Sequence, residues 1–457
     1  DLTEKRVASI VCSGEMLMRN KKMLVTLLAL ILGLVAAFGA VACGEDEATE
    51  TTAAPTETTA APTETTAAPT ETTAAPTETT AAGGFKGEVK IGGLGSMTGQ
   101  NAMTGAEMIW AYERAVKDIN AAGGIKLPDG NYELKLTMVD DKTDATEGAA
   151  GAEKLIKAEG IKLILSSNIT PINLAAGIVA EKYECYFQIA TSWTDYIDEQ
   201  DFKWVSDIFF TPKAATEIPF NVAGLMPESE RPQNWLMLTE DNTDGEGMAA
   251  GAVAVSDEFG YKTAMVERYT PGTKDFSSII LKLKQNNVDA LITLIGSADA
   301  ITFMKQMKEQ NFSPKLLFGW KGFWPTEVMT ALQADSDYLG HDGFWSEGNG
   351  APGSAELGQA FKDEHDGLDS VSIGLSYANV QILAQAIEKA GSTEPAAVRD
   401  QVFGGTFEGT TMGDVTYNDQ GICDVAPYGL WWKDGKRVQY WPEAGNQIEW
   451  FVPWDQR

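Results

Sequence analysis

The chain has 457 residues and a formal net charge of -30, with 65 acidic against 35 basic side chains. This length suits two or three domains, and a hydrophobic content of 44% is ordinary for a globular protein. The acidity argues against nucleic acid as a partner, because phosphate contacts require basic patches. With only two histidines and no CxxC motif, we expect no metal site and no cofactor.

The first 43 residues have the pattern of a leader with a signal peptide. Residues 18–23 are basic and residues 24–38 are apolar. The segment then ends in Ala40, Val41, Ala42 and Cys43, which resembles the bacterial lipoprotein box. The resemblance implies cleavage before Cys43, a lipid on its sulfur and anchoring at the outer face of the cell membrane. A plain secretory signal and a retained membrane helix are the alternatives, although the apolar run is short for a span.

Residues 44–84 read as a linker between this leader and the folded chain. The heptapeptide TETTAAP repeats from Thr49 onward. Each full copy contains a proline and no large apolar residue, so no core can form and the segment is expected to stay disordered or extended. Its threonines would suit O-glycosylation, but nothing in the sequence requires it.

Beyond the leader, only Cys185 and Cys423 remain. A long-range disulfide is one interpretation in an exported protein. Cys185 lies in a strand pattern that we expect to be buried, which favours two inert thiols.

From residue 85 onward, apolar strand patterns alternate with amphipathic helix patterns. Strands are expected at 88–94, 132–140, 161–165, 185–190 and 202–210, and again at 235–240, 263–269, 289–295 and 315–318. Helices are expected between them at 106–120, 145–158, 169–182, from 214, and at 248–259, 276–286 and 299–310. The last part has a strand at 344–347, helices at 355–365 and 377–389, and short strands at 415–417, 428–432 and 438–440. This alternation predicts an α/β fold with two doubly wound parallel-sheet lobes.

Two loops could be taken for ligand-binding loops, one for phosphate and one for calcium. The glycine-rich loop Gly95–Gly105 lacks the Lys and Ser/Thr of a phosphate-binding loop and is not a GxGxxG fingerprint. The acidic turn with Asp140, Asp141 and Asp144 does not have the spacing of a calcium loop, so a helix-capping turn is favoured.

Polar turns follow two neighbouring strands between residues 161 and 196. Ser166, Ser167 and Asn168 end the first strand, and the turn 191–193 ends the second. Ligands of open α/β sheets lie outside the carboxyl ends of strands, so these turns are candidates for half of a pocket. Capping of the helices that follow is the alternative.

Three segments carry a family resemblance: VKIGGLGSMTGQNAMTG near the start, YTPGTKDFSSIILKLKQNNVDALI in the middle, and FEGTTMGDVTYNDQG near the end. Their order and spacing resemble the substrate-binding proteins of ABC importers of the branched-chain amino-acid type, which have the type I periplasmic binding fold. The resemblance covers residues 88–441. It implies two lobes, 85–210 plus 344–417 and 211–343 plus 418–457, which are joined by three hinge crossings and close over a solute.

The resemblance also implies ligand-binding positions. In the first lobe these are Ser166 and Ser167 in one turn and Thr191, Ser192 and Trp193 in the next. In the second lobe they are Asp244 and Lys321, and Met97 and Trp320 would line the mouth.

The sequence departs from the family pattern at two of these positions. Lys321 stands where amino-acid binders often carry an acid, and Trp193 stands where they often carry Thr. Together they favour a small carboxylate, aromatic or aliphatic, over leucine. Asp244 could receive an ammonium group or pair with Lys321 across the closed cleft, and exposure of both charges at the lobe rims is the alternative.

The sequence therefore predicts a monomeric extracytoplasmic lipoprotein that delivers a small solute to an ABC permease and ATPase complex. A receptor of the same fold that signals to a membrane partner is the second hypothesis, and genomic neighbours would separate the two. An enzyme is disfavoured, because the chain has no GxSxG elbow, Cys/His pair or metal set.

Overall fold

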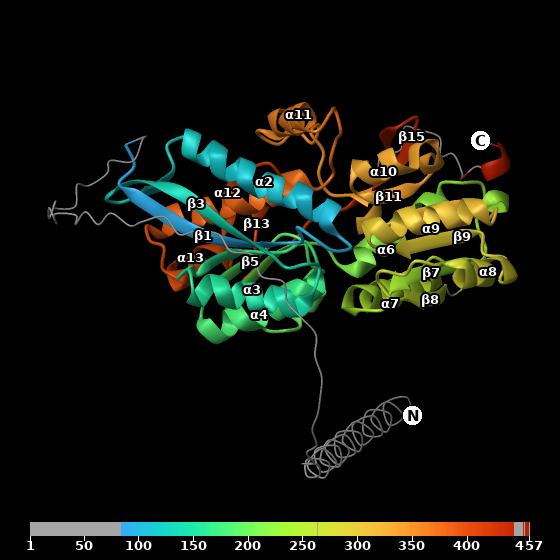
Figure 1. Cartoon of the computed structure of the whole chain (residues 1–457), viewed down its shortest axis with the longest axis horizontal. Coiled ribbons are helices and arrows are strands. Elements are labelled where there is room, and N and C mark those ends of the chain that lie inside the picture. The colour runs from blue at the N-terminus through green and yellow to red at the C-terminus, as the bar shows by residue number, and fades with distance from the viewer. Residues whose placement is uncertain (1–83, 263, 443–450, 452, 457) are drawn as a thin grey trace, which may run out of the picture. The chain divides into compact units, whose positions relative to one another are not determined.

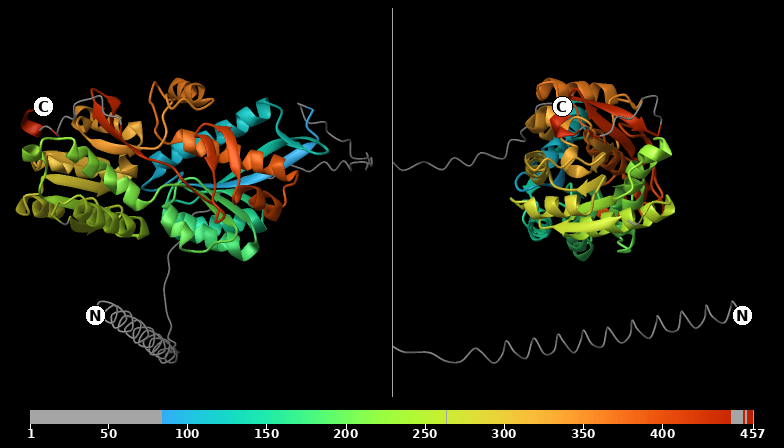
Figure 2. Two further views of the ribbon diagram at one scale, coloured as in Figure 1. Left: turned by 180° about the vertical axis from the view of Figure 1, so that it is seen from behind. Right: turned by 90° about the vertical axis from the view of Figure 1, so that its right-hand side faces the viewer.

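The computed structural model describes residues 84–262, 264–442, 451 and 453–456. The predicted leader, Cys43 and the repeat linker lie outside these residues. Within the described part, two seven-stranded sheets and a two-stranded ribbon form the framework. Figures 1 and 2 show the two sheets side by side, each with helices on both faces.

The first sheet has the strand order β14-β6-β5-β4-β1-β3-β2, and β2 alone is antiparallel to its neighbour. Its strands are β1 (Gly87–Gly95), β2 (Ile125–Leu127), β3 (Gly130–Asp140), β4 (Leu163–Leu165), β5 (Tyr186–Ile189), β6 (Val205–Phe209) and β14 (Ile422–Asp424). Helices α3 (Ala145–Lys157) and α4 (Thr170–Tyr183) cover one face. Helices α2 (Ala102–Ala121), α12 (Ile373–Ala390) and α13 (Pro395–Val402) cover the other. The short helix α5 (Thr194–Asp198) follows β5.

The second sheet has the order β16-β15-β11-β10-β9-β7-β8, in which β15 and β16 are antiparallel. Its strands are β7 (Trp235–Glu240), β8 (Met265–Tyr269), β9 (Ala290–Leu294), β10 (Leu316–Gly319), β11 (Gly340–Gly343), β15 (Tyr428–Lys433) and β16 (Lys436–Trp441). Helices α6 (Pro212–Gly224) and α7 (Thr243–Glu258) pack on one face. Helices α8 (Ser277–Gln285), α9 (Ser297–Glu309) and α10 (Thr326–Leu332) pack on the other. Helix α11 (Ser354–Glu364) and the ribbon β12 (Thr406–Thr410) with β13 (Gly413–Thr416) complete the main elements.

The chain passes between the two sheets three times: after β6, after β11, and between β14 and β15. The three predicted crossings are therefore present. The third lies later than we expected, because β14 still pairs in parallel with β6 of the first sheet. The predicted boundary at residue 418 is thus wrong by several residues.

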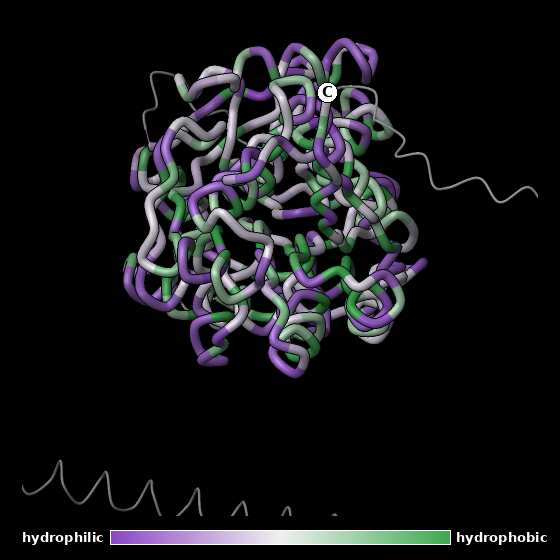
Figure 3. Tube along the Cα trace, turned by 90° about the vertical axis from the view of Figure 1, so that its left-hand side faces the viewer, coloured by the Kyte–Doolittle hydropathy of each residue, from purple (hydrophilic) through white to green (hydrophobic). Residues whose placement is uncertain are grey.

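The central strands are buried on both faces, as expected for parallel sheets covered by helices on both sides. Every residue of β4, β5, β6, β7 and β9 is buried. Their apolar runs are the signal that made them predictable. Figure 3 shows hydrophilic residues concentrated in the outer loops.

Several predicted elements differ from the observed ones. Helices α2 and α7 begin four and five residues earlier than their apolar periodicity indicated, at Ala102 and Thr243. The expected strand 344–347 does not form; the strand there is β11, Gly340–Gly343. The short elements β2, β12, β14, α5, α10 and α13 were missed.

Cys185 and Cys423 are free and buried, which confirms the interpretation as two thiols. Among the helices that the structure describes, none is both long and apolar enough to cross a membrane.

Candidate functional site

The carboxyl ends of the two sheets face each other. Thr104, in the first turn of α2, lies 3.3 Å from the hydroxyl of Ser297 at the start of α9. Its hydroxyl also donates to the carbonyl of Lys321, at 3.4 Å. Because strand ends and helix N-termini converge here from both lobes, this region is where an open α/β sheet presents a ligand site.

The predicted first-lobe turns are buried and tied to each other. Ser166, Ser167 and Ser192 have no exposed surface, and Thr191 is 7% exposed. The Ser166 hydroxyl accepts the N–H of Ala190 at 3.1 Å, and the Thr191 hydroxyl donates to the Ser167 carbonyl at 3.2 Å. The structure thus brings both turns together at one place.

Asn173 of α4 links these turns and fixes their relative position. Its side-chain amide donates to the Ser167 carbonyl at 3.0 Å and to the Ser192 hydroxyl at 3.0 Å. No side chain caps α4 or α5, so the capping interpretation of these turns is wrong. By contrast, Asp144 does cap α3 by accepting two backbone N–H groups, as predicted.

Trp193 lies in an aromatic cluster at the crossings. Its ring centroid is 5.6 Å from that of Phe209, which is 6.5 Å from Trp324 of the second lobe. Phe344, just after β11, contacts the same group. Met97, in contrast, is 43% exposed in the loop after β1, where its N–H binds Asp140.

Lys321 is buried and paired with two carboxylates of its own lobe. Its Nζ donates to Glu240 at 2.7 Å and to Asp244 at 3.2 Å, and all three side chains are at most 6% exposed. Burial alone would lower the pKa of Lys321, but attraction by Glu240 and Asp244 outweighs it and raises the pKa.

The predicted pairing of Asp244 with Lys321 is therefore confirmed, but the expectation that it spans the cleft is wrong, since both residues belong to the second lobe. Exposure at the lobe rims is also wrong. With two acids beside one lysine, the group carries a net negative charge. This net charge does not favour an anionic ligand.

Some residues of these turns and helix starts carry buried polar atoms without a hydrogen-bond partner. Among the described residues they include the Nε1 atoms of Trp193 and Trp320 and the Oδ1 atom of Asp244. The side-chain oxygens of Gln100 and Asn101, at the start of α2, also have none. Because such atoms cost free energy when unpaired, they indicate where a polar solute would bind.

Glu107 of α2 is a buried acid close to the same region. It accepts hydrogen bonds from Ser370 at 2.5 Å and from Ser372 at 2.7 Å. Burial raises its pKa from 4.5 to about 7, although those two hydrogen bonds and the charge of Arg437 oppose the shift. Glu327 of α10 adds to the increase.

We expect Glu107 to make the stability pH-dependent. A carboxyl group whose pKa is higher in the folded chain stabilises it below pH 4.5, and this contribution is lost as the pH rises through about 7. At about 1.4 kcal/mol per pKa unit, the loss is about 3.5 kcal/mol. Urea unfolding of wild type and Glu107→Gln at pH 4 to 8 checks this, since the variant lacks that part of the pH dependence. Parallel curves would contradict it.

Sequence reasoning missed three residues that build the site. Asp141 accepts hydrogen bonds from Ser96 and Ser167, and so joins the ends of β1 and β4. Asn173 joins the two first-lobe turns, and Glu240 is the second partner of Lys321. Glu240 alone left a signal, since it is an acid at the end of a strand that begins with four apolar residues.

The family model for periplasmic binding proteins matches residues 88–428. The chain belongs to this family. The resemblance found in the sequence is confirmed. A relative from Brucella abortus (strain 2308), "Leu/Ile/Val-binding protein homolog 1", is 27% identical over 348 residues, which are 75% of this chain and 90% of the relative.

Solved structures agree with this fold. The branched-chain amino acid substrate-binding protein LivJ from Streptococcus pneumoniae, in complex with isoleucine, has a TM-score of 0.67 and 19% identity. The match covers 77% of this chain and 99% of that one. A solute-binding protein of an ABC transporter from R. palustris, in complex with benzoate, has a TM-score of 0.67, 15% identity and coverage of 80% and 97%. The type I periplasmic binding fold is therefore established for this periplasmic binding protein.

Proposed function

We propose that the protein is an extracytoplasmic solute-binding lipoprotein that delivers a small solute to an ABC importer. The relatives named above support the solute-binding role. Cys43 would carry the lipid, and its sequence context supports this part. The protein would work by binding and conformational change, without covalent chemistry.

The solute would bind where the carboxyl ends of the two sheets meet. The observation that carries this placement is that buried polar atoms of both lobes, among them Trp193 Nε1 and Asp244 Oδ1, have no partner among the described residues. A solute that satisfies atoms of both lobes binds the closed form better than an open one. It therefore drives hinge closure by differential affinity.

We propose an amino acid as the solute class. Glu240 and Asp244 leave an excess of one negative charge beside Lys321, and Asp244 Oδ1 has no partner among the described residues. An ammonium group would complement this charge. On the other lobe, the Ser192 hydroxyl accepts from Asn173 and keeps its own proton to donate to a carboxylate.

A small aromatic carboxylate is the second candidate. The unpartnered indole N–H groups of Trp193 and Trp320 favour it, because each can donate to a carboxylate oxygen beside an aromatic wall. The relative crystallised with benzoate shows that the fold accommodates such a solute.

We expect Asp244→Asn to weaken amino-acid binding by about tenfold to a hundredfold, since hydrogen bonds to charged groups contribute about 1.5–3 kcal/mol. Calorimetric titration of the full chain with leucine and with benzoate measures this. Glu246→Gln is the matched control, because it removes the same charge from an exposed position of the same helix.

The control should bind leucine as the wild type does. Unchanged leucine binding by Asp244→Asn would rule out the ammonium site. Tight benzoate binding that Ser192→Ala removes, without any response to amino acids, would favour the second candidate.

A further inference from the structure

A cavity of about 230 Å³ lies beside the second and third crossings, and its walls come from both lobes. From the first lobe, Trp345, Lys362 and Val371 line it; from the second lobe, Leu430 and Arg437 do. None of the residues predicted to bind the solute is among its lining residues. Its volume is below the usual range for drug-sized ligands, so it suits a small molecule.

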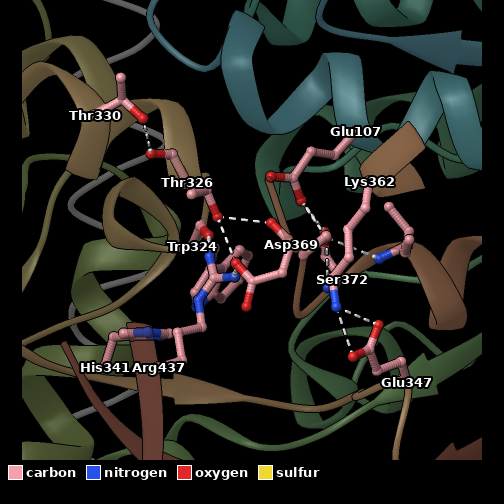
Figure 4. A network of polar contacts seen from close by, with 12 residues as sticks. Glu107, Trp324, Thr326, Thr330, His341, Glu347, Lys362, Asp369, Ser372 and Arg437 are labelled. Atoms are coloured by element: carbon pink, nitrogen blue, oxygen red, sulfur yellow. Dashed lines mark hydrogen bonds and ion pairs between the residues drawn. The ribbon is translucent and has the colours of Figure 1, made fainter. Parts of the chain in front are cut away.

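Arg437 of β16 is held rigidly at this cavity. Its side chain is only 4% exposed, and its guanidinium lies 4.4 Å from the ring centroid of Trp432. One terminal nitrogen pairs with Asp369 and the other donates to the carbonyl of Trp324. Figure 4 shows this network, in which the guanidinium of Arg437 lies next to Asp369 and Trp324. The remaining Nε–H is buried and has no partner among the described residues.

The other charges of the wall are already balanced. Lys362 of α11 pairs with both carboxylate oxygens of Glu347, at 2.6 and 2.7 Å, and Asp369 neutralises Arg437. Trp345, Val371 and Leu430 supply apolar surface. The wall thus offers one unpartnered guanidinium N–H, held in place by Asp369 and Trp324, beside apolar side chains. An unpartnered guanidinium N–H is best satisfied by a carboxylate oxygen.

The same residues connect the lobes. Thr326 of α10 donates to the carbonyl of Asp369 at 2.6 Å and to its carboxylate at 2.9 Å. Asp369 lies in the loop before α12, which packs on the first sheet, whereas Thr326 and Arg437 belong to the second lobe. A molecule in this cavity would therefore contact both lobes and favour the form in which they are together.

We propose that this cavity is a second ligand site, separate from the solute site, and that it takes a small monocarboxylate with an apolar body. Its carboxylate accepts the Nε–H of Arg437, and its body packs against Leu430 and Trp345. Occupancy stabilises the closed arrangement of the lobes.

Benzoate is the probe, and benzamide, its uncharged analogue, is the control ligand. Calorimetric titration of the full chain measures both. Leu430→Trp fills the cavity, and Leu430→Phe does so more mildly in case the larger ring disturbs folding. Arg437→Lys keeps the charge that pairs with Asp369 but removes the Nε–H. Each variant should weaken benzoate binding by about tenfold or more, and benzamide should bind at least about tenfold more weakly than benzoate.

Ser192→Ala separates this site from the proposed solute site. Ser192→Ala should leave benzoate binding at the cavity intact and weaken leucine binding at the solute site. Leu430→Phe should weaken benzoate binding and leave leucine binding intact. The inference is overturned if benzoate does not bind the wild type, if the folded Leu430 variants still bind it, or if benzamide binds equally well. Loss of benzoate binding in Ser192→Ala would also overturn it, by assigning benzoate to the solute site.

Discussion

Replacing Lys321 by alanine should lower the free energy of unfolding by about 3–5 kcal/mol. The substitution leaves Glu240 and Asp244 buried together without their shared cation. Removing one partner of a buried ion pair has a cost of this size, because the remaining charge is neither hydrated nor neutralised. Urea unfolding of the purified variant measures the loss.

Lys308→Ala is the matched control. Lys308 also pairs with an acid, Asp335, but its side chain is 51% exposed. Such surface pairs contribute only about 0–1 kcal/mol. A triple variant, Lys321→Met with Glu240→Gln and Asp244→Asn, should recover much of the stability, because no unpaired charge remains. Equal losses in Lys321→Ala and Lys308→Ala would show that water reaches the lysine and that the buried group described above does not exist.

The strands were the most predictable part of this fold. β7 lies where its apolar run placed it, at Trp235–Glu240, because a strand buried on both faces is largely apolar. β11 was misplaced because its sequence contains no such apolar run. Its sequence, Gly-His-Asp-Gly, has no strand propensity, and the strand forms because it pairs between β10 and β15.

The sequence predicted the position of the candidate site, but not the hydrogen bonds and ion pairs within it. Polar turns after apolar strands identified Ser166 and Ser192, and the family resemblance identified Lys321; the fold does bring these turns to the facing sheet ends. Which hydroxyl or carboxylate each one contacts depends on pairs far apart along the chain. Glu240 and Lys321 are separated by 81 positions, and no local pattern links them. The inference that Lys321 favours a carboxylate ligand no longer follows, because Glu240 was not foreseen as its partner.

Helix starts were the least predictable feature, for a reason that concerns the site. Periodicity placed the beginnings of α2 and α7 at the first apolar residues after a glycine-rich segment. In the structure, Gly105 and Gly245 lie in the first turns of these helices. A Cβ at Gly105 would lie 2.1 Å from the carbonyl oxygen of Ser96, and one at Gly245 would lie 1.8 Å from that of Glu240. Each glycine lets its helix begin directly against the end of the preceding strand.

Gly245→Ala should therefore disrupt the second-lobe half of the site. The new methyl group meets backbone, which cannot rotate away as a side chain would, so α7 must shift and carry Asp244 away from Lys321. We expect a loss of roughly 3 kcal/mol in the free energy of unfolding, measured by urea unfolding. Solute affinity should fall together with it, measured by calorimetric titration.

Gly224→Ala is the control for this substitution. Gly224 is the last residue of α6, and a Cβ there would meet nothing within 4 Å. Alanine is favoured over glycine in helices by up to about 1 kcal/mol, so this variant should be as stable as the wild type or slightly more stable. If Gly245→Ala behaved like Gly224→Ala, the start of α7 could not be packed against Glu240. The charge group of Lys321, Glu240 and Asp244 would then lose the rigid support on which the proposed ammonium site depends.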